Sequence, residues 1–345
     1  MPETPRALGF RMPAEWEPHE ATWIAWPHNR DDWPGRFAPI PWVYAEIVRK
    51  LARVERVRIV VENSPGEDAA RRILRKADAN LAAVDFFHAP TNRSWTRDYC
   101  PLFVKNRAGE VALTNWRFNG WAKYADHTND AAIPATLAAA LKLRAWEPGL
   151  VLEGGSIDVN GRGLLLTTEE CLLSPVQARN PQLTRPEIET ALRDYLGAPV
   201  VIWLRNGIAG DDTHGHVDDL ARFVNPETVV IASEPDRSDA NYEPLRENLA
   251  ILRELPLRVV KLPMPAPLIF NGRRLPASYA NFYIANGLVL VPTFNDPNDR
   301  IALNTLARLF PDREVTGINA VELVWGLGTL HCMTQQQPCV TEPRP

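Results

Sequence analysis

The feature that most constrains the fold of this chain is a repeated pair of elements, in which an amphipathic helical segment leads directly into a β-rich segment. The β-rich segments begin at Val84, Arg144, Val200, Leu257 and Arg313, at intervals of 60, 56, 57 and 56 residues. This regularity predicts five similar αβ modules. In a closed ring each module would bury its apolar faces against two neighbours. An irregular α/β sheet with coincidental spacing is the alternative.

The helices of these pairs are predicted over Glu67–Ala79, Ala131–Leu141, Thr184–Leu196, Tyr242–Leu255 and Asp299–Phe310. The third has the clearest start, because the Thr184 side chain can cap a free backbone N–H while Glu187 reaches back to the cap residue. Further strands are predicted within the modules, in HVDDLARFV with TVVIAS and in FYIAN with GLVLVP.

An additional helix over Val43–Arg56 and a strand in VRIVVE precede the first counted module. We expect this pair to close the ring against the last module. The stretch before it is rich in Trp and Pro, and its aromatic content argues against disorder. The sequence therefore predicts a single domain over 1–345, with a packed cap over about 1–42 and the ring over about 43–338.

Composition excludes several classes of protein. The chain is 45% hydrophobic and 23% charged, as in ordinary globular proteins, and its net charge is −4 without any block of Lys or Arg. Nucleic acid is therefore not an expected partner. No apolar run has the length of a signal peptide or of a membrane span, so we expect a cytoplasmic protein without a membrane partner.

The four cysteines are spread thinly, and no CxxC pair suggests a zinc knuckle or a redox dithiol. Cys332, in GTLHCMTQQQP, follows a flexible glycine and lies among polar groups. A free thiol has a pKa of about 8.5, so it needs a base or a cation nearby to react at neutral pH. Considered alone, Cys332 could equally be a small buried hydrophobic residue.

The segment GDDTHGHVDDLARFV places His214, His216 and Asp218 at alternate positions. If the segment is extended, all three side chains project from one face. A carboxylate there could hold a substrate cation while an imidazole moves protons. A zinc site built from the three residues and a solvated polar loop are the alternatives.

Two further segments carry candidate residues. SWTRDYCP presents Trp95, Arg97 and Asp98 between a turn-rich and an apolar stretch, where a surface Arg–Asp pair is the simpler interpretation. VLEGGSIDVNG places Glu153 before two glycines, which either let the backbone approach a ligand or form a plain turn.

The repeat links these separate candidates. Asp98, Glu153, His216 and Cys332 follow the first residue of their module's leading strand by 14, 9, 16 and 19 residues. In a closed ring such equivalent positions converge on the axis. With Asp218 the pocket would hold three carboxylates, one imidazole and one thiol. This set suits a planar cation, because carboxylates bind guanidinium N–H groups in pairs.

These segments resemble the agmatine deiminase and bacterial-type peptidylarginine deiminase family, part of the guanidine-modifying superfamily. The resemblance is carried, in order, by RMPAEWEPHEATWIAWP, WTRDY, LEGGSIDVNGRG, GHVDD, ASYANFYIANGLVLVPTF and LHCMTQQQP. It implies a five-bladed pseudo-symmetric α/β propeller of the pentein type, in a single domain.

The resemblance also implies roles for residues. Cys332 would be the nucleophile, His216 the general acid/base, and Asp98 and Asp218 the carboxylates that hold the guanidinium. Glu153 would be the acidic residue beside the catalytic histidine. The family implies neither a metal nor an organic cofactor, which weakens the zinc interpretation.

Trp95, from the same motif as Asp98, is expected to contact the substrate.

Three departures from the family pattern bear on substrate choice and on the shape of the pocket loops. Cys100 replaces a usual Gly and would be strained if that position had a positive φ. The loop NGWAKY around Trp121 is shortened, and His214 stands where Asp or Asn is common.

The expected activity is hydrolytic deimination of a small cationic guanidine through a covalent thiouronium on cysteine. Agmatine, giving N-carbamoylputrescine and ammonia, is the favoured substrate, which would place the enzyme in putrescine synthesis. The alternatives are a peptidylarginine or arginine deiminase, an amidinotransferase and a non-catalytic guanidine-binding protein. Association of identical chains is left open.

Overall fold

The computed structural model describes residues 3–340, so residues 1–2 and 341–345 of the predicted domain lie outside the described part of the chain. Four of its sheets share one pattern, in which an antiparallel pair is extended by a parallel third strand. Their strands are β4 (Leu102–Lys105), β5 (Val111–Thr114) and β6 (Ala145–Trp146); β7 (Asp158–Val159), β8 (Leu164–Thr168) and β9 (Val200–Leu204); β10 (Ala221–Asn225), β11 (Thr228–Ser233) and β12 (Arg258–Pro263); and β15 (Tyr283–Ala285), β16 (Leu288–Thr293) and β17 (Glu314–Asn319).

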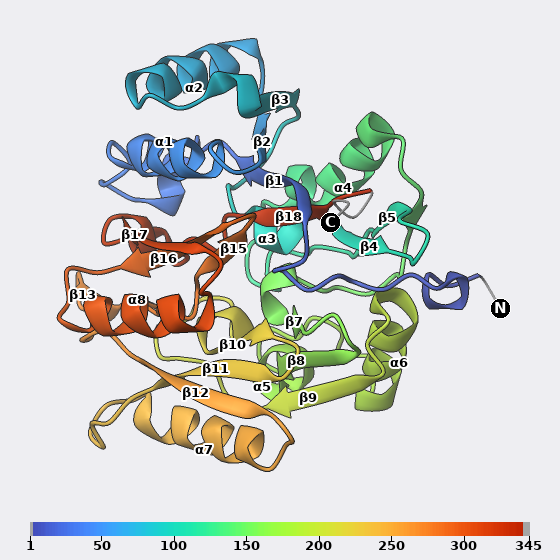
Figure 1. Ribbon diagram of the computed structural model, residues 1–345, viewed down its shortest axis with the longest axis vertical. Coiled ribbons are helices and arrows are strands. Elements are labelled where there is room, and N and C mark those ends of the chain that lie inside the picture. The colour runs from blue at the N-terminus through green and yellow to red at the C-terminus, as the bar shows by residue number, and fades with distance from the viewer. Residues whose placement is uncertain (1–2, 341–345) are drawn as a thin grey trace.

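A fifth sheet joins the two ends of the chain. Its order is β18-β1-β2-β3, where β1 is His19–Ala25, β2 is Arg56–Val61, β3 is Val84–His88 and β18 is Gln335–Pro338. β18 pairs antiparallel with β1, and β1 pairs parallel with β2 (Figure 1). The sheet therefore repeats the pattern of the other four and adds β3. A small hairpin of β13 (Ile269–Phe270) and β14 (Arg273–Arg274) lies apart from the five sheets.

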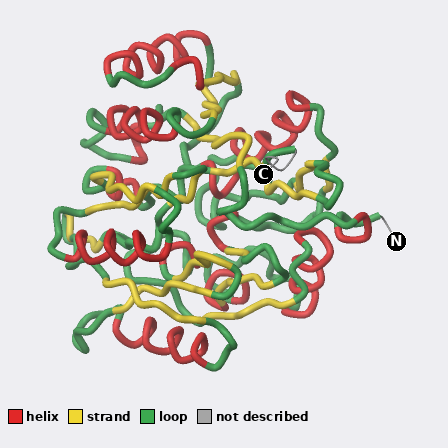
Figure 2. The backbone as a smooth tube through the Cα atoms, in the orientation of Figure 1, coloured by secondary structure: helices red, strands yellow, loops and turns green. Residues whose placement is uncertain are grey.

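Helices make the crossovers to the parallel strands. They are α1 (Ile40–Leu51), α2 (Ser64–Lys76), α4 (Thr128–Leu141), α6 (Arg185–Leu196), α7 (Tyr242–Arg253) and α8 (Asn298–Leu309). In Figure 1, α2, α6 and α7 lie at the edge of the molecule, and Figure 2 shows the strands further inside. Two short helices, α3 (Thr96–Tyr99) and α5 (Glu169–Leu173), and 3-10 turns such as η4 (Gly154–Ser156), η5 (Val217–Asp219) and η6 (Leu323–Gly326) lie in the connections.

The five predicted helix–strand pairs are present, with helix ends within three residues of the predicted ones. The capping box of α6 is confirmed, since the Glu187 carboxylate accepts from the Thr184 backbone N–H at 2.7 Å. Gly197 ends this helix at a φ of 68°, a conformation that favours glycine. The fold is thus a mixed α/β domain, as the repeat predicts.

The predicted cap over residues 1–42 is wrong in part. This stretch contains β1, an inner strand of the fifth sheet, and α1 begins at Ile40. The strand pair β1–β18 joins the chain ends, and the predicted strand VRIVVE is β2, which lies next to β1 in the same sheet. Trp23, Ile24 and Ala25 form a short, fully buried apolar run, and periodicity cannot distinguish such a run from other buried structure.

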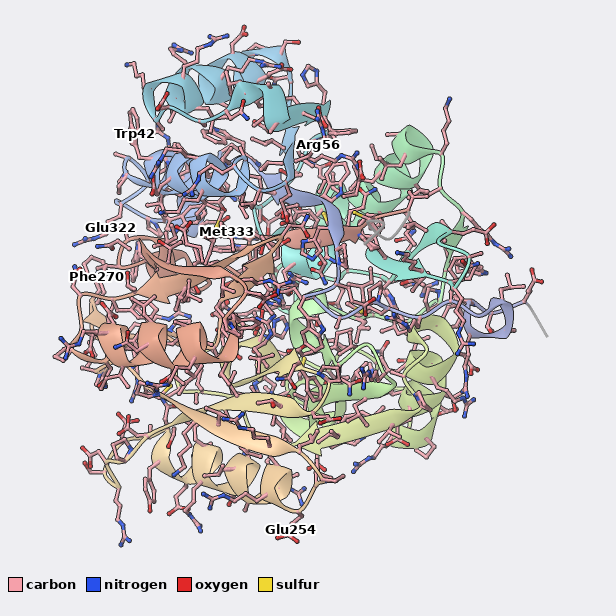
Figure 3. The ribbon with its side chains drawn as sticks, in the orientation of Figure 1. Trp42, Arg56, Glu254, Phe270, Glu322 and Met333 are labelled. Atoms are coloured by element: carbon pink, nitrogen blue, oxygen red, sulfur yellow. The ribbon has the colours of Figure 1, made fainter. Side chains whose placement is uncertain are left out.

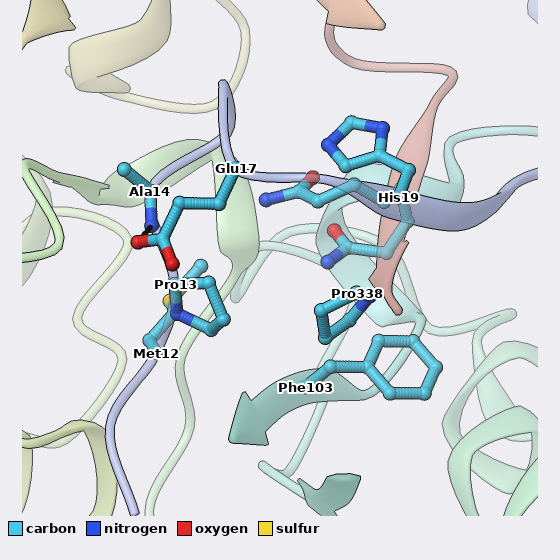
Figure 4. A pocket seen from close by; sticks show the side chains of 9 residues that line it. Met12, Pro13, Ala14, Glu17, His19, Phe103 and Pro338 are labelled. Carbon is cyan, nitrogen blue, oxygen red and sulfur yellow. Dashed lines mark hydrogen bonds between the residues drawn. The ribbon is translucent and has the colours of Figure 1, made fainter. Parts of the chain in front are cut away.

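The N-terminal segment continues across the molecule before it enters β1. Met12 and Pro13 lie beside Phe103 of β4 and Pro338 of β18 in a small crevice (Figure 4). The Glu17 carboxylate accepts from the Ala14 backbone N–H at 2.9 Å and fixes the turn. No helix between residues 3 and 340 has the length and apolar character needed to cross a bilayer.

Replacement of Trp23 by Ala tests the importance of the β1–β18 junction. The Trp23 ring is fully buried, contacts Phe87 of β3, and its indole N–H donates to Gln337 of β18 at 2.9 Å. We expect Trp23→Ala to lower the free energy of unfolding by about 3–5 kcal/mol in urea titrations. Trp42→Ala is the matched control, because Trp42 is 47% exposed on α1 (Figure 3) and should shift it by less than about 0.5 kcal/mol. Equal losses in the two variants would contradict this assignment.

Candidate active site

A cavity of about 200 Å³ opens beside Cys332. Its lining combines acidic and aromatic side chains with a glycine-rich turn, and consists of Asp31, Asp32, Arg93, Trp95, Asp98, Trp121, Tyr124, Asp212, Thr213, Gly326, Leu327, Gly328 and Cys332.

The predicted site residues come from equivalent connections of the repeat. Asp98 lies in α3, before the hairpin β4–β5, and Glu153 precedes η4, before β7–β8. His216 precedes η5 and Asp218 lies within it, before β10–β11. Cys332 lies in the turn between η6 and β18. The structure therefore brings together the thiol, the imidazole and all three carboxylates that the sequence singles out.

Residues 214–218 are not extended, so His214, His216 and Asp218 do not project from one face. His214 has a φ of 64°, and residues 217–219 form η5, so the chain turns sharply here. The His214 ring contacts Ser174 at 3.1 Å instead of joining the other two side chains. Among the described residues, the donor groups within 4.8 Å of one another are Glu153, Cys171 and His216, and Asp218, Asp219 and Cys332. The postulated His214–His216–Asp218 zinc site is not assembled.

Cys332 is buried among polar groups. Asn281 donates to its Sγ at 3.2 Å, and Asp218 Oδ2 lies 3.8 Å from the same sulfur. Burial, followed by the charges of Asp218, Asp219 and Asp98, raises the pKa of the thiol well above its usual range. The thiol is therefore protonated at neutral pH until a cation offsets these carboxylates.

His216 lies between two carboxylates. Its Nδ1 is 3.7 Å from Asp98 Oδ1 and its Nε2 is 3.6 Å from Glu153 Oε2, and neither ring nitrogen has a hydrogen-bond partner in the described structure. Burial alone would lower the pKa of the imidazole, but Asp98, Cys171 and Glu153 outweigh it and raise this pKa well above its usual range. The ring is therefore a cation with N–H groups available to a ligand.

Asp98 is held by two donors. Its Oδ1 accepts from the Gly155 backbone N–H at 3.0 Å, and its Oδ2 accepts from the Trp121 indole at 2.9 Å. Burial raises the pKa of this carboxyl to about 6 against the opposing charge of His216. A Cβ at Gly155 would lie only 2.6 Å from His216 Nδ1 and 2.8 Å from Asp98 Oδ1, so the close approach excludes any side chain here.

Glu153 is paired with a buried arginine. Arg179 Nε donates to Glu153 Oε1 at 3.0 Å, and both side chains are fully buried. Burial alone would raise the pKa of Glu153, but the charges of Arg179 and His216 lower it to about 2. Glu153 is thus a permanent carboxylate next to the His216 ring.

Asp218 uses only one of its two oxygens. His331 Nδ1 contacts Oδ2 at 2.6 Å, while Oδ1 has no partner among the described residues. The neighbouring Asp219 accepts from Asn281 Nδ2 at 3.0 Å, and Asn281 Oδ1 accepts from the His331 backbone N–H. Asn281 therefore fixes the turn that carries Cys332.

Trp95 forms a wall beside the nucleophile. A Cβ at Gly328 would lie 2.9 Å from the Trp95 ring and 3.0 Å from Cys332 Cβ, so the glycine lets these groups lie close together. The predicted surface pair of Arg97 and Asp98 is not formed, because Arg97 is buried and donates to Gln336 at 2.7 Å. Cys100 has a φ of −66° and is not strained.

Several groups at the site escape the sequence analysis, namely Glu15, Arg179, Asp219, Asn281 and His331. The analysis names the Trp121 loop but not the contact of Trp121 with Asp98. His331 and Asp219 adjoin residues that the analysis selects, so adjacency was a usable signal. The sequence gives no such signal for Arg179, because this residue lies in an irregular stretch without a motif or a hydrophobic period around it.

The site combines a buried thiol beside Asp218 with an imidazolium between Asp98 and Glu153, on a mixed α/β fold. These features define a protein with a cysteine in an acidic pocket. Residues 11–338 match the family model of the Porphyromonas-type peptidyl-arginine deiminases. The chain belongs to this family.

Individual relatives agree with this membership. The agmatine deiminase of Pseudomonas aeruginosa (strain LESB58) is 39% identical over 97% of both chains, and that of Pseudomonas putida is 37% identical over the same shares. The solved agmatine deiminase of Enterococcus faecalis superposes with a TM-score of 0.91 at 33% identity over 98% of each chain. An amidinotransferase, SxtG from Microseira wollei, shares the fold with a TM-score of 0.54 at 12% identity.

Replacement of Arg179 tests the buried pair. Arg179→Met leaves the Glu153 charge buried without its partner, so we expect the free energy of unfolding to fall by about 3–5 kcal/mol in urea titrations. Arg185→Met is the control, because Arg185 is exposed and pairs with Glu169 and Glu189 at the surface. Arg185→Met should lower the free energy of unfolding by less than about 1 kcal/mol. Similar costs for the two variants would argue against a buried ion pair.

Proposed function

We propose that this protein is an agmatine deiminase, which hydrolyses agmatine to N-carbamoylputrescine and ammonia through a covalent intermediate on Cys332. The observation that carries the proposal is the buried cluster of Cys332, His216 and three carboxylates. The relatives named agmatine deiminases, which match nearly the whole chain, support the same activity.

The first step is binding of the guanidinium. Asp98 lines the cavity, and Asp218 lies behind the lining residue Cys332, with Oδ2 3.8 Å from its Sγ and with Oδ1 without a partner in the described structure. Charge-assisted hydrogen bonds from guanidinium N–H groups would satisfy this oxygen and offset the buried charge. The flat Trp95 ring beside Cys332 supplies a wall for a planar group.

Binding of the cation favours ionisation of the nucleophile. The carboxylates that raise the pKa of the Cys332 thiol are the groups that the guanidinium neutralises. The thiol proton leaves to solvent, and the thiolate attacks the guanidinium carbon to give a neutral tetrahedral adduct. The Asn281 N–H that donates to Sγ stabilises the sulfur anion.

His216 then moves the protons. As an imidazolium it protonates the departing amino group, which leaves as ammonia, and an S-alkylthiouronium remains on Cys332. The neutral ring next takes a proton from water, whose oxygen adds to the same carbon. Collapse of this adduct expels the sulfur, which takes the remaining hydroxyl proton and returns to the thiol, and yields the neutral ureido product. Glu153, held by Arg179, keeps the His216 ring oriented between the two reactions.

The far end of the cavity favours agmatine over arginine. Arg93 lines it, but its terminal nitrogens donate to Asp32 and Asp126, and its guanidinium stacks on Tyr124. A substrate carboxylate would have to compete with these aspartates. Asp212 in the lining is paired with Lys123 and Arg273. Asp31 also lines the cavity, so aspartates outnumber Arg93 in the lining, and the cavity suits a second ammonium group better than an anion.

The repeat explains why the site forms where it does. We propose that the five sheets are the blades of a pseudo-symmetric propeller. The equivalent pattern of the sheets and the equivalent origin of Asp98, Glu153, His216 and Cys332 support this arrangement.

Ammonia release from agmatine, free arginine and a peptide ending in arginine tests the function. We expect agmatine to give the highest kcat/KM and Cys332→Ser to lose turnover with its fold intact, because a serine hydroxyl in this setting is far harder to ionise. Cys100→Ser is the control and should keep most of the activity. Preference for the peptide would contradict the substrate, and near-normal turnover in Cys332→Ser would contradict the mechanism.

The pH dependence tests the role of Asp98. Its pKa of about 6 means that the carboxyl gains a proton as the pH falls through 6, and a neutral carboxyl holds the guanidinium less well. We expect kcat/KM for agmatine to fall below about pH 6. Glu153, with its pKa of about 2, stays ionised in this range. In Asp98→Asn the activity should be low, and the fall in kcat/KM below about pH 6 should vanish. If the fall stays unchanged in that variant, another group causes it.

A further inference from the structure

A chain of buried side chains lies behind the substrate-facing carboxylate Asp218. His331 bridges two carboxylates, with Nδ1 2.6 Å from Asp218 Oδ2 and Nε2 2.7 Å from Glu15 Oε2. All three side chains are almost fully buried. Glu15 comes from the N-terminal segment and His331 from the turn before β18, so the chain ends meet in this triad.

Glu15 is itself fixed by several donors. Arg222 Nη2 lies 2.9 Å and Arg97 Nη2 lies 3.3 Å from Glu15 Oε2, and the Ile284 backbone N–H donates to Oε1 at 2.8 Å. Burial alone would raise the pKa of Glu15, but Arg222, His331 and Arg97 lower it well below its usual range. The carboxylate is therefore a charged anchor that cannot turn away from His331.

The two oxygens of Asp218 differ in their contacts. Oδ2 contacts His331 Nδ1 at 2.6 Å and also accepts from the Cys332 thiol, whose Sγ lies 3.8 Å away. Oδ1 is left without a partner in the described structure. Without the contact to His331 the carboxylate could rotate, and neither oxygen would be held in place for the substrate cation.

We propose that Glu15 and His331 are positioning residues, which fix the Asp218 carboxylate beside Cys332, where it binds the substrate cation. The inference rests on the proposed function, since it assigns a purpose to the carboxylate that binds the guanidinium. Neither residue touches the reacting atoms. Their effect on the reaction passes entirely through Asp218.

Two substitutions of His331 separate positioning from simple space filling. An Asn side chain can place a donor near the Nδ1 position of His, and a Gln side chain can place one near the Nε2 position. His331→Asn thus keeps the contact with Asp218, and His331→Gln keeps only the contact with Glu15. We expect kcat/KM for agmatine to fall about 10- to 100-fold in His331→Gln and clearly less in His331→Asn. A mere packing role would make the shorter Asn the more damaging change.

Alkylation of Cys332 gives a readout that does not depend on turnover. Its thiolate displaces chloride from either 2-chloroacetamidine, a planar cation, or 2-chloroacetamide, its neutral analogue. The ratio of the two rates reports how well Asp218 presents its charge. We expect this ratio to fall about tenfold or more in His331→Gln and to stay near the wild-type value in His331→Asn.

Glu15→Gln is the second variant, because it keeps the shape of the anchor but removes its charge. Its alkylation ratio should also fall, with a melting temperature that shows a folded protein. His88→Gln is the matched control, since His88 forms a similar His–Glu pair with Glu67 at the surface, 2.6 Å apart, and should change neither readout.

The outcomes are distinct. A wild-type protein that favours the amidine but does not release ammonia from agmatine would overturn the proposed function and leave the triad supported. Unchanged alkylation ratios in both His331→Gln and Glu15→Gln, or a larger loss in His331→Asn than in His331→Gln, would overturn the triad alone.

Discussion

Burial of several negative charges around one thiol is the constraint on which the rest of the site depends. A carboxylate removed from water is costly unless it is paired or hydrogen-bonded. Each of the carboxylates here meets this requirement with a different partner. Arg179 pairs with Glu153, the Gly155 backbone and Trp121 hold Asp98, His331 contacts Asp218, and Asn281 donates to Asp219.

Even with these partners, the site lacks positive charge when no ligand is bound. Without a ligand the pKa of Cys332 is raised, and the nitrogens of His216 and one oxygen of Asp218 have no partner in the described structure. A guanidinium supplies the missing charge and the missing donors together. In the proposed mechanism the reactive thiolate therefore forms in the presence of the substrate, and neutral molecules that reach the cavity meet a thiol.

The same constraint explains why the ends of the chain meet beside the site. The antiparallel pair β1–β18 holds the N-terminal segment next to the Cys332 turn, and this brings Glu15 within reach of His331. α3 adds a second tie, because the Arg97 backbone N–H donates to the Cys332 carbonyl at 3.1 Å. Pairing of the chain ends and placement of the Cys332 turn thus depend on one set of contacts.

The sequence by itself determined the repeated helix–strand pairs, the cap at Thr184 and the set of Asp98, Glu153, His216, Asp218 and Cys332, because periodicity, capping and short motifs act over a few neighbouring residues. It did not reveal that β1 is an inner strand, that residues 217–219 form a turn, or that Arg179 balances Glu153. Only the tertiary structure decided those features, and with them which oxygen of Asp218 stays free. The physical reason is that each depends on electrostatic and packing contacts between residues far apart in the chain, which exist only once the five sheets have assembled.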